Sequence, residues 1–249
     1  MNDVQLLMIH GLLGSIDYFA PRRYLEGITL HTPDQLGYGA QADAAPADID
    51  LQRQADRIAR IVADDIGKPT WLLGHSVGGA VAMLVAARVP ELITGLISVE
   101  GNFTLNDAFW CARIAATARS EWDQQYRVMA ADPQGLLARG EIASTPERLA
   151  MAAAILANQP AATVHGMARS VIAHTGDPGY LALVRDVVAR TPLYLIAGER
   201  SAAGWDVPAW ARAAARGSTV LAGTGHMMML EDPAGFCASI RAIVAPAGA

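Results

Sequence analysis

The sequence has little of what several classes of protein depend on. It contains two cysteines, Cys111 and Cys237, too few for a disulfide framework, so we expect both to be buried free thiols. No apolar run reaches the ~20 residues that span a bilayer. The segment 1–5 has neither the positive charge nor the apolar stretch of a secretory leader. These absences favour a soluble, cytoplasmic protein without a membrane partner.

Positive charge is also sparse. Lys68 is the only lysine among 19 basic residues, which are scattered without a basic block, and the formal net charge is −5. Nothing in the electrostatics therefore favours a nucleic acid or an anionic membrane as partner. We also expect no metal and no cofactor.

What the sequence does contain is apolar residues in a regular order. The 249 residues are 52% hydrophobic, enough for one large α/β domain or for such a domain with an inserted lid. Short apolar runs typical of buried strands alternate with amphipathic helical patterns, which indicates βαβ crossovers and a parallel sheet. The runs are 4–9, 28–31, 71–75, 92–99, 192–197 and 219–221, and the helical patterns between or after them are 50–66, 77–89, 208–216 and 233–244.

The alternation lapses between the fourth and fifth runs. Residues 105–190 show only helical patterns, separated by proline-containing breaks such as Asp132-Pro133 and Thr145-Pro146, where the first residue is typical of an N-cap. We therefore expect an inserted helical cap over 103–190, with 1–102 and 191–249 forming the core domain.

One motif joins a strand to a helix. The run Trp71-Leu72-Leu73 enters Gly74-His75-Ser76-Val77-Gly78, and a helical pattern follows. Strand, sharp turn and helix around Gly-x-Ser-x-Gly are the context of a nucleophile elbow, which would make Ser76 the nucleophile. The alternative is that Ser76 only caps the helix.

With this motif the chain resembles the α/β-hydrolase superfamily over nearly its whole length. The resemblance rests also on the His10-Gly11-Leu12 loop after the first strand and on Gly225-His226 near the C-terminus. It implies an α/β-hydrolase fold of about six mostly parallel strands flanked by helices, with a helical lid inserted and the usual N-terminal hairpin missing. It also implies an oxyanion hole formed by the backbone amides of Leu12 and Val77.

The same resemblance places the general base at His226. Five other histidines compete for that role. The loops that hold His10 and His75 correspond to places where histidines of the family are structural, and two more lie in the expected cap. The competitors are His10, His31, His75, His165 and His174.

The base also needs an acid that orients it, and the sequence offers three candidates for this role. In the family it often follows the fifth strand in a Gly-x-x-Asp pattern, but here Ser201 stands in place of that aspartate. We expect Glu100, at the end of the fourth apolar run and about two dozen residues beyond Ser76, to be the acid, since open α/β sheets build their sites at such strand ends. Asp206 and Glu199 remain alternatives.

The resemblance implies an enzyme, a serine hydrolase of the carboxylesterase or lactonase type. An apolar, alanine-rich cap favours a small, moderately hydrophobic acyl substrate, and we expect Leu13, His75, Phe103, Trp110 and Met227 to contact it. The fold alone leaves other reactions open: C–C bond hydrolysis, thioester hydrolysis, a lyase reaction, or ligand binding without catalysis. The chain is expected to be a monomer or a homodimer.

Overall fold

A single parallel sheet forms the centre of the molecule. The computed structural model describes residues 4–245, so part of the segment on which the no-leader expectation rests lies outside the described residues. Six strands lie in the order β2-β1-β3-β4-β5-β6, and every neighbouring pair is parallel. This confirms the predicted fold class. The strands are β1 (Gln5–Ile9), β2 (Thr29–His31), β3 (Thr70–His75), β4 (Ile93–Val99), β5 (Leu193–Gly198) and β6 (Gly217–Leu221).

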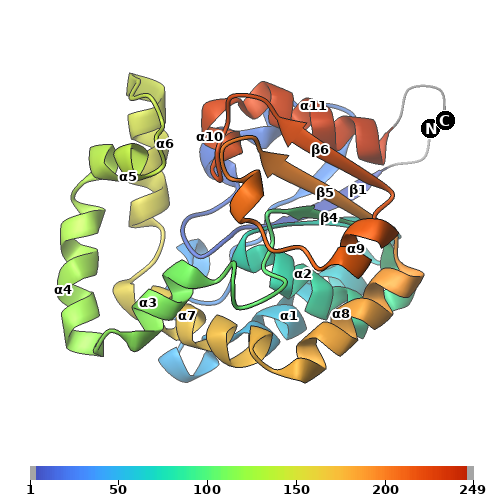
Figure 1. Ribbon diagram of the computed structural model, residues 1–249, viewed down its shortest axis with the longest axis horizontal. Helices are drawn as coiled ribbons and strands as arrows, with labels where there is room; N and C mark the ends of the chain where they lie inside the picture. Colours follow the sequence, from blue (N-terminus) through green and yellow to red (C-terminus); the bar gives the residue numbers. More distant parts are fainter. Residues whose placement is uncertain (1–3, 246–249) are drawn as a thin grey trace.

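Helices cover both faces of this sheet. On one face lie α1 (Leu51–Arg60), α2 (Val77–Arg88) and α8 (Pro178–Arg190), and on the other lies α11 (Pro233–Val244) (Figure 1). Successive β1 residues alternate between the two layers: Leu7 packs towards α1 and α2, whereas Leu6 packs towards α11. The central strands are therefore mostly buried on both faces, which explains their largely apolar runs.

Between β4 and β5 the chain forms only helices and the loops that join them, as the sequence predicts. The helices are α3 (Phe109–Ala116), α4 (Arg119–Ala130), α5 (Pro133–Arg139), α6 (Pro146–Ala157), α7 (Ala161–Thr175) and α8. Asp132 and Thr145 cap α5 and α6 through their side chains, each followed by proline. The two predicted N-caps are thus confirmed.

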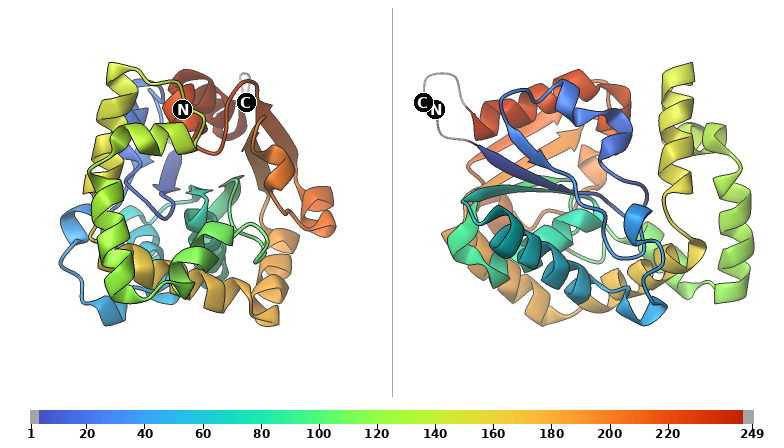
Figure 2. Two further views of the ribbon diagram at one scale, coloured as in Figure 1. Left: turned by 60° about the vertical axis from the view of Figure 1, so that its left-hand side comes forward. Right: turned by 180° about the vertical axis from the view of Figure 1, so that it is seen from behind.

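The three helices α4, α5 and α6, called the outer helices below, extend to one side of the sheet (left in Figure 1; Figure 2 shows them from two further directions). In contrast, α7 packs against α1, α3 and α4, and α8 packs against α2. The outer helices meet the core at α10 (Met228–Glu231), where a small apolar cluster forms. Its buried members are Leu137, Ile142, Ala152, Ile155 and Leu230.

Smaller elements complete the chain. The helical pattern predicted over 50–66 ends as a π-helix, Ile61–Ile66, after α1, and α9 spans Ala209–Ala214. Cys111 and Cys237 are both buried and free, as expected. None of the helices in residues 4–245 has the length and apolarity needed to cross a membrane. Short 3₁₀ turns span Asp17–Phe19, Pro21–Arg23, Gly39–Gln41, Pro46–Asp48, Pro90–Leu92 and Ala202–Gly204.

Candidate active site

Ser76 sits in a strained turn between β3 and α2. Its backbone has φ 53° and ψ −123°, a conformation that L-residues adopt only where the surroundings hold it. The turn is tight because backbone segments approach one another closely there. A Cβ on Gly74 would lie 2.3 Å from the Gly78 carbonyl oxygen, and one on Gly78 would lie 2.4 Å from that of Ile9. Only glycine fits these two positions of the motif.

The side chain of Ser76 has no structural task in the helix that follows it. Ser76 occupies the N-cap position of α2 but makes no side-chain cap hydrogen bond. Its backbone is held instead, since Ser76 N donates to Val99 O at 3.0 Å, and Asn102 N donates to Ser76 O at 3.1 Å. Within residues 4–245 no hydrogen bond joins Ser76 Oγ to His226, so the hydroxyl is free to meet another partner.

The His-Gly loop after β1 lies directly against this turn. A Cβ on Gly11 would lie 3.1 Å from Ser76 Cβ, so the two segments are in van der Waals contact. The loop is fixed from behind, because the Tyr38 hydroxyl donates to Leu12 O at 3.0 Å. Val77 is the first residue of α2, where backbone amides lack partners within the helix. Gly11 therefore lies beside Ser76, and the role of the Leu12 and Val77 amides as an oxyanion hole stays a prediction.

His226 and Glu100 form a close pair. His226 Nδ1 lies 2.6 Å from Glu100 Oε2, slightly closer than the ~2.7–2.9 Å typical of a charge-assisted hydrogen bond from nitrogen to a carboxylate. The Glu100 side chain is only 4% exposed, whereas that of His226 is 45% exposed. The carboxylate is therefore enclosed by protein, and the imidazole presents its other side to the surface.

Two further donors hold Glu100. Ser201 Oγ donates to Glu100 Oε1 at 2.6 Å, and Gly198 N donates to the same oxygen at 2.8 Å. Burial by itself raises the pKa of Glu100, but the hydrogen bonds and the positive charge available on His226 outweigh it, so the pKa lies below its ordinary value. Glu100 also has a positive φ, 41°. The serine that replaces the family's usual aspartate thus supports the carboxylate at Glu100.

The two alternative acids contact other groups. Asp206 accepts hydrogen bonds from Thr104 Oγ1 at 2.6 Å and Asn106 Nδ2 at 2.8 Å. Glu199 accepts one from Gly223 N at 2.8 Å. Both carboxylates tie loops together, and in residues 4–245 neither contacts His226.

The competing histidines have structural partners. His75 Nε2 donates to the backbone oxygen of His226 at 3.0 Å, and their rings lie 4.7 Å apart, so His75 supports the His226 loop from within. His10 is buried against Tyr38. The other three hydrogen-bond to the chain: His31 to Gln5, His165 to Thr117 and His174 to Ser170.

The residues expected to contact a substrate differ in exposure. Phe103 is 1% exposed and lies against Trp205, with the ring centroids 6.1 Å apart. Leu13, Trp110 and Met227 are half-buried beside the apolar clusters. Phe103 therefore serves packing, and the half-buried three have surface left for a ligand.

Sequence reasoning missed several groups that shape the site. Asp107 accepts hydrogen bonds from Asn102, Phe103 and Thr104, and fixes the chain after β4. In the sequence, Ser201 stands out only because it occupies the place of the expected aspartate. In residues 4–245 no three His, Cys, Asp or Glu side chains gather in an arrangement that could hold a metal ion.

Two buried histidines predict acid sensitivity. Burial lowers the pKa of His10 to about 4 and that of His75 to about 3, from an ordinary 6.5. Below pH 6.5 the unfolded chain binds protons at both positions while the folded chain does not, so stability falls as pH falls. We expect a loss of about 2 kcal/mol between pH 6.5 and 5.5 from the two together.

Urea unfolding at a series of pH values measures this loss. The variant H10Q should make the slope shallower by the share of one histidine, while Asp107, whose pKa burial raises to about 6, contributes in the opposite sense in both proteins. A stability that stays flat from pH 6.5 to 5.5 would contradict the prediction.

Comparison with known proteins shows the family of the chain. The model of the alpha/beta hydrolase family matches residues 6–239. Lipase 3 of Moraxella sp. (strain TA144) is 34% identical over 111 residues, which are 44% of this chain and 34% of that lipase. Lipase LipV of Mycobacterium tuberculosis (strain ATCC 25618 / H37Rv) is 35% identical over 107 residues, 42% of this chain and 40% of that lipase. The matches thus span little more than a third of the length of these curated relatives.

Solved structures match over almost the whole chain. A thermophilic esterase from Thermogutta terrifontis superimposes with a TM-score of 0.72 at 22% identity, covering 96% of this chain and 88% of the esterase. The N-acyl homoserine lactonase AidH gives a TM-score of 0.67 at 20% identity, covering 97% of this chain and 90% of the lactonase. At these identities the likeness shows a common fold.

Proposed function

We propose a function that starts from one premise: the chain belongs to the alpha/beta hydrolase family. On this premise the protein is a serine hydrolase that cleaves a small, moderately hydrophobic carboxylic ester or lactone. The observation that carries the proposal is the pair of Glu100 Oε2 and His226 Nδ1 at 2.6 Å, on the loops next to a strained Ser76. Similarity to lipases, an esterase and a lactonase supports the choice of bond.

The first half of the reaction forms an acyl-enzyme. His226 removes the proton from Ser76 Oγ as this oxygen attacks the substrate's carbonyl carbon, and Glu100 stabilises the resulting imidazolium. The amides of Leu12 and Val77 donate to the oxyanion of the tetrahedral intermediate, where each such donor typically contributes ~3 kcal/mol. When the intermediate collapses, the C–O bond breaks and the alcohol leaves with the proton from His226.

The second half restores the enzyme. His226 removes a proton from water, which attacks the acyl carbon, and the acid leaves as Ser76 Oγ regains its proton. For a lactone the alcohol and the acid are parts of one product. The half-buried apolar side chains of Leu13, Trp110 and Met227 suit an apolar acyl or alcohol group.

A substrate panel with an active-site label tests the proposal. p-Nitrophenyl esters of increasing acyl length and simple lactones should turn over, with short to medium esters preferred, and a fluorophosphonate probe should attach to the peptide that holds Ser76. Thioesters and a substrate for C–C cleavage are included as arms for the other reactions. Absence of turnover with esters and lactones, together with no label on Ser76, would refute the proposal.

A further inference from the structure

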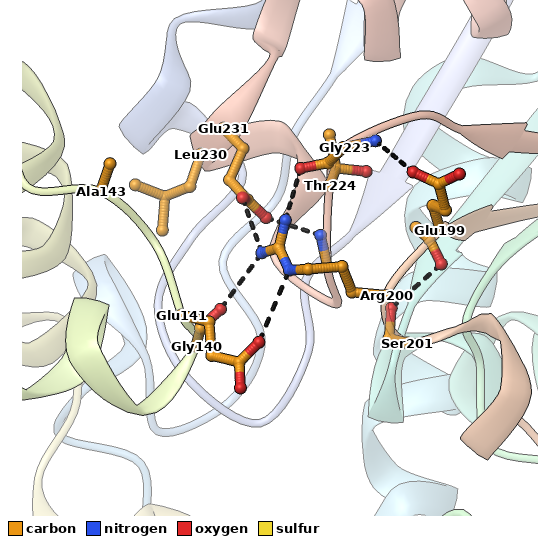
Figure 3. Close-up of polar contacts among 12 residues, drawn as sticks. Gly140, Glu141, Ala143, Glu199, Arg200, Ser201, Gly223, Thr224, Leu230 and Glu231 are labelled. Carbon is orange, nitrogen blue, oxygen red and sulfur yellow. Dashed lines mark hydrogen bonds and ion pairs between the residues drawn. The ribbon is translucent and has the colours of Figure 1, made fainter.

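We propose that Arg200 is a positioning residue that holds the loop of His226 and joins it to the turn after α5. The inference rests on the proposed function of His226 as base. Arg200 lies outside the triad, in the segment after β5 where the family's aspartate pattern is absent. Figure 3 shows its guanidinium at the centre of a group of polar contacts that come from both sides.

The main partner of Arg200 is Glu231, at the end of α10. Arg200 Nη2 lies 2.8 Å from Glu231 Oε2, and the two side chains are 31% and 9% exposed. A carboxylate so buried needs a partner, since removal of the cation would leave its charge uncompensated. Glu231 is thus the enclosed partner of the pair, whereas Arg200 keeps about a third of its side chain exposed.

Glu231 in turn holds the segment that precedes His226. Its other oxygen, Oε1, accepts a hydrogen bond from Gly225 N at 2.7 Å, and Gly225 directly precedes His226. Arg200 also holds the two residues before that: Arg200 N donates to Thr224 O at 2.9 Å, and Arg200 Nη1 donates to Gly223 O. Three successive residues before His226 thus depend on Arg200, directly or through Glu231.

The same guanidinium contacts the turn that follows α5. Arg200 Nη2 donates to Gly140 O at 3.3 Å, and Arg200 Nε lies 3.8 Å from a carboxylate oxygen of Glu141. This turn comes from the outer helices and approaches the loop of His226 from the opposite side (Figure 3). Arg200 thus connects the turn of the outer helices with the loop that holds His226.

The contacts of Arg200 with Glu141 and with Glu231 differ in their expected effect on the rate. Glu141 is 79% exposed, and exposed ion pairs contribute little because water screens them. In the pair with Glu231 the carboxylate is only 9% exposed, and a small displacement of a catalytic group can cost about a hundredfold in rate. Arg200 should therefore act on the reaction chiefly through Glu231.

Variants of Arg200 test this role. We expect R200Q to lower kcat for a p-nitrophenyl ester about 10- to 100-fold with KM within about threefold, because the base is displaced while the binding surface remains. R200K keeps the charge opposite Glu231 and should stay within about fivefold of the wild type. The rates are expressed per competent site, counted by fluorophosphonate titration, so that loss of folded protein does not enter.

The pathway through Glu231 is tested by a double-mutant cycle. E231Q should resemble R200Q, and the double variant R200Q/E231Q should be no slower than the slower single one, because both remove the same link. E141Q removes only the contact to the outer helices and should change kcat less than twofold. R212A, which removes an exposed arginine of α9, is the matched control and should behave as wild type.

The outcomes separate this inference from the proposed function. If the wild-type protein hydrolyses no ester, the proposed function itself fails. If it does, and R200Q keeps its kcat per site, Arg200 does not position the base. A loss in R200K equal to that in R200Q, or a loss in E141Q equal to it, would likewise overturn the route through Glu231.

Discussion

Replacing Ser76 with alanine is expected to lower kcat for a p-nitrophenyl ester roughly 10⁵- to 10⁶-fold, the size of loss known for removal of a triad nucleophile. Alanine has no oxygen to form the acyl-enzyme, and water must then attack without the covalent step. The oxyanion amides of Leu12 and Val77 are backbone groups and stay in place, so a small residual rate remains. Steady-state kinetics at high enzyme concentration, with loss of the fluorophosphonate label, measures the effect.

The stability of S76A separates this role from that of a helix cap. A capping serine contributes about 1 kcal/mol, but Ser76 makes no cap hydrogen bond. The urea midpoint of S76A should therefore equal or exceed that of the wild type. S120A, a change at an exposed serine of α4, is the control and should leave both rate and midpoint unchanged. Activity in S76A within tenfold of the wild type would exclude Ser76 as nucleophile.

Replacing Glu100 with glutamine is expected to lower kcat roughly 10³- to 10⁴-fold, comparable with loss of the acid charge in other triads. The side chain keeps its shape, but a neutral amide neither stabilises the imidazolium nor favours the tautomer with the proton on His226 Nδ1. KM should change little, because Glu100 is buried behind the histidine and away from the substrate. The measurement is kcat and KM for the same ester, per titrated site.

A matched change at the alternative acid gives the control. D206N should retain activity within about threefold, since Asp206 bonds only Thr104 and Asn106 among the described residues and a single amide can keep part of those contacts. If D206N were the slower variant and E100Q stayed near the wild-type rate, the assignment of the acid to Glu100 would be wrong.

Local patterns predicted the fold well because each is set by neighbours in sequence. The apolar runs gave six strands, and the prolines with their N-caps gave the starts of α5 and α6. Ser76 and His226 carry motifs, and Glu100 could be chosen because Ser201 lacks a carboxylate. The strands, the caps and the motifs depend on residues a few positions apart, whereas the choice of Glu100 compares two segments 101 residues apart.

The rest depends on contacts between distant segments. No pattern joins Arg200 to Gly140, 60 residues away, or to Glu231, 31 residues away, because side-chain partners are selected by packing. The placement of the outer helices beside α10 is of the same kind, since their apolar faces would fit several neighbours. The predicted boundary of the cap and the catalytic roles stay predictions.

The backbone at the ends of β3 and β4 bears on how this fold tolerates change. Among residues 4–245 only four non-glycine residues have positive φ, and Ser76 and Glu100 are two of them. Such conformations typically cost about 1–3 kcal/mol each, against the 5–15 kcal/mol by which a domain is stable. A serine and a glutamate at these positions thus lower the free energy of unfolding, and the fold then tolerates fewer destabilising mutations elsewhere. The proposed chemistry of the site and the capacity of the rest of the chain to accept mutations are therefore both limited by the same free energy of unfolding.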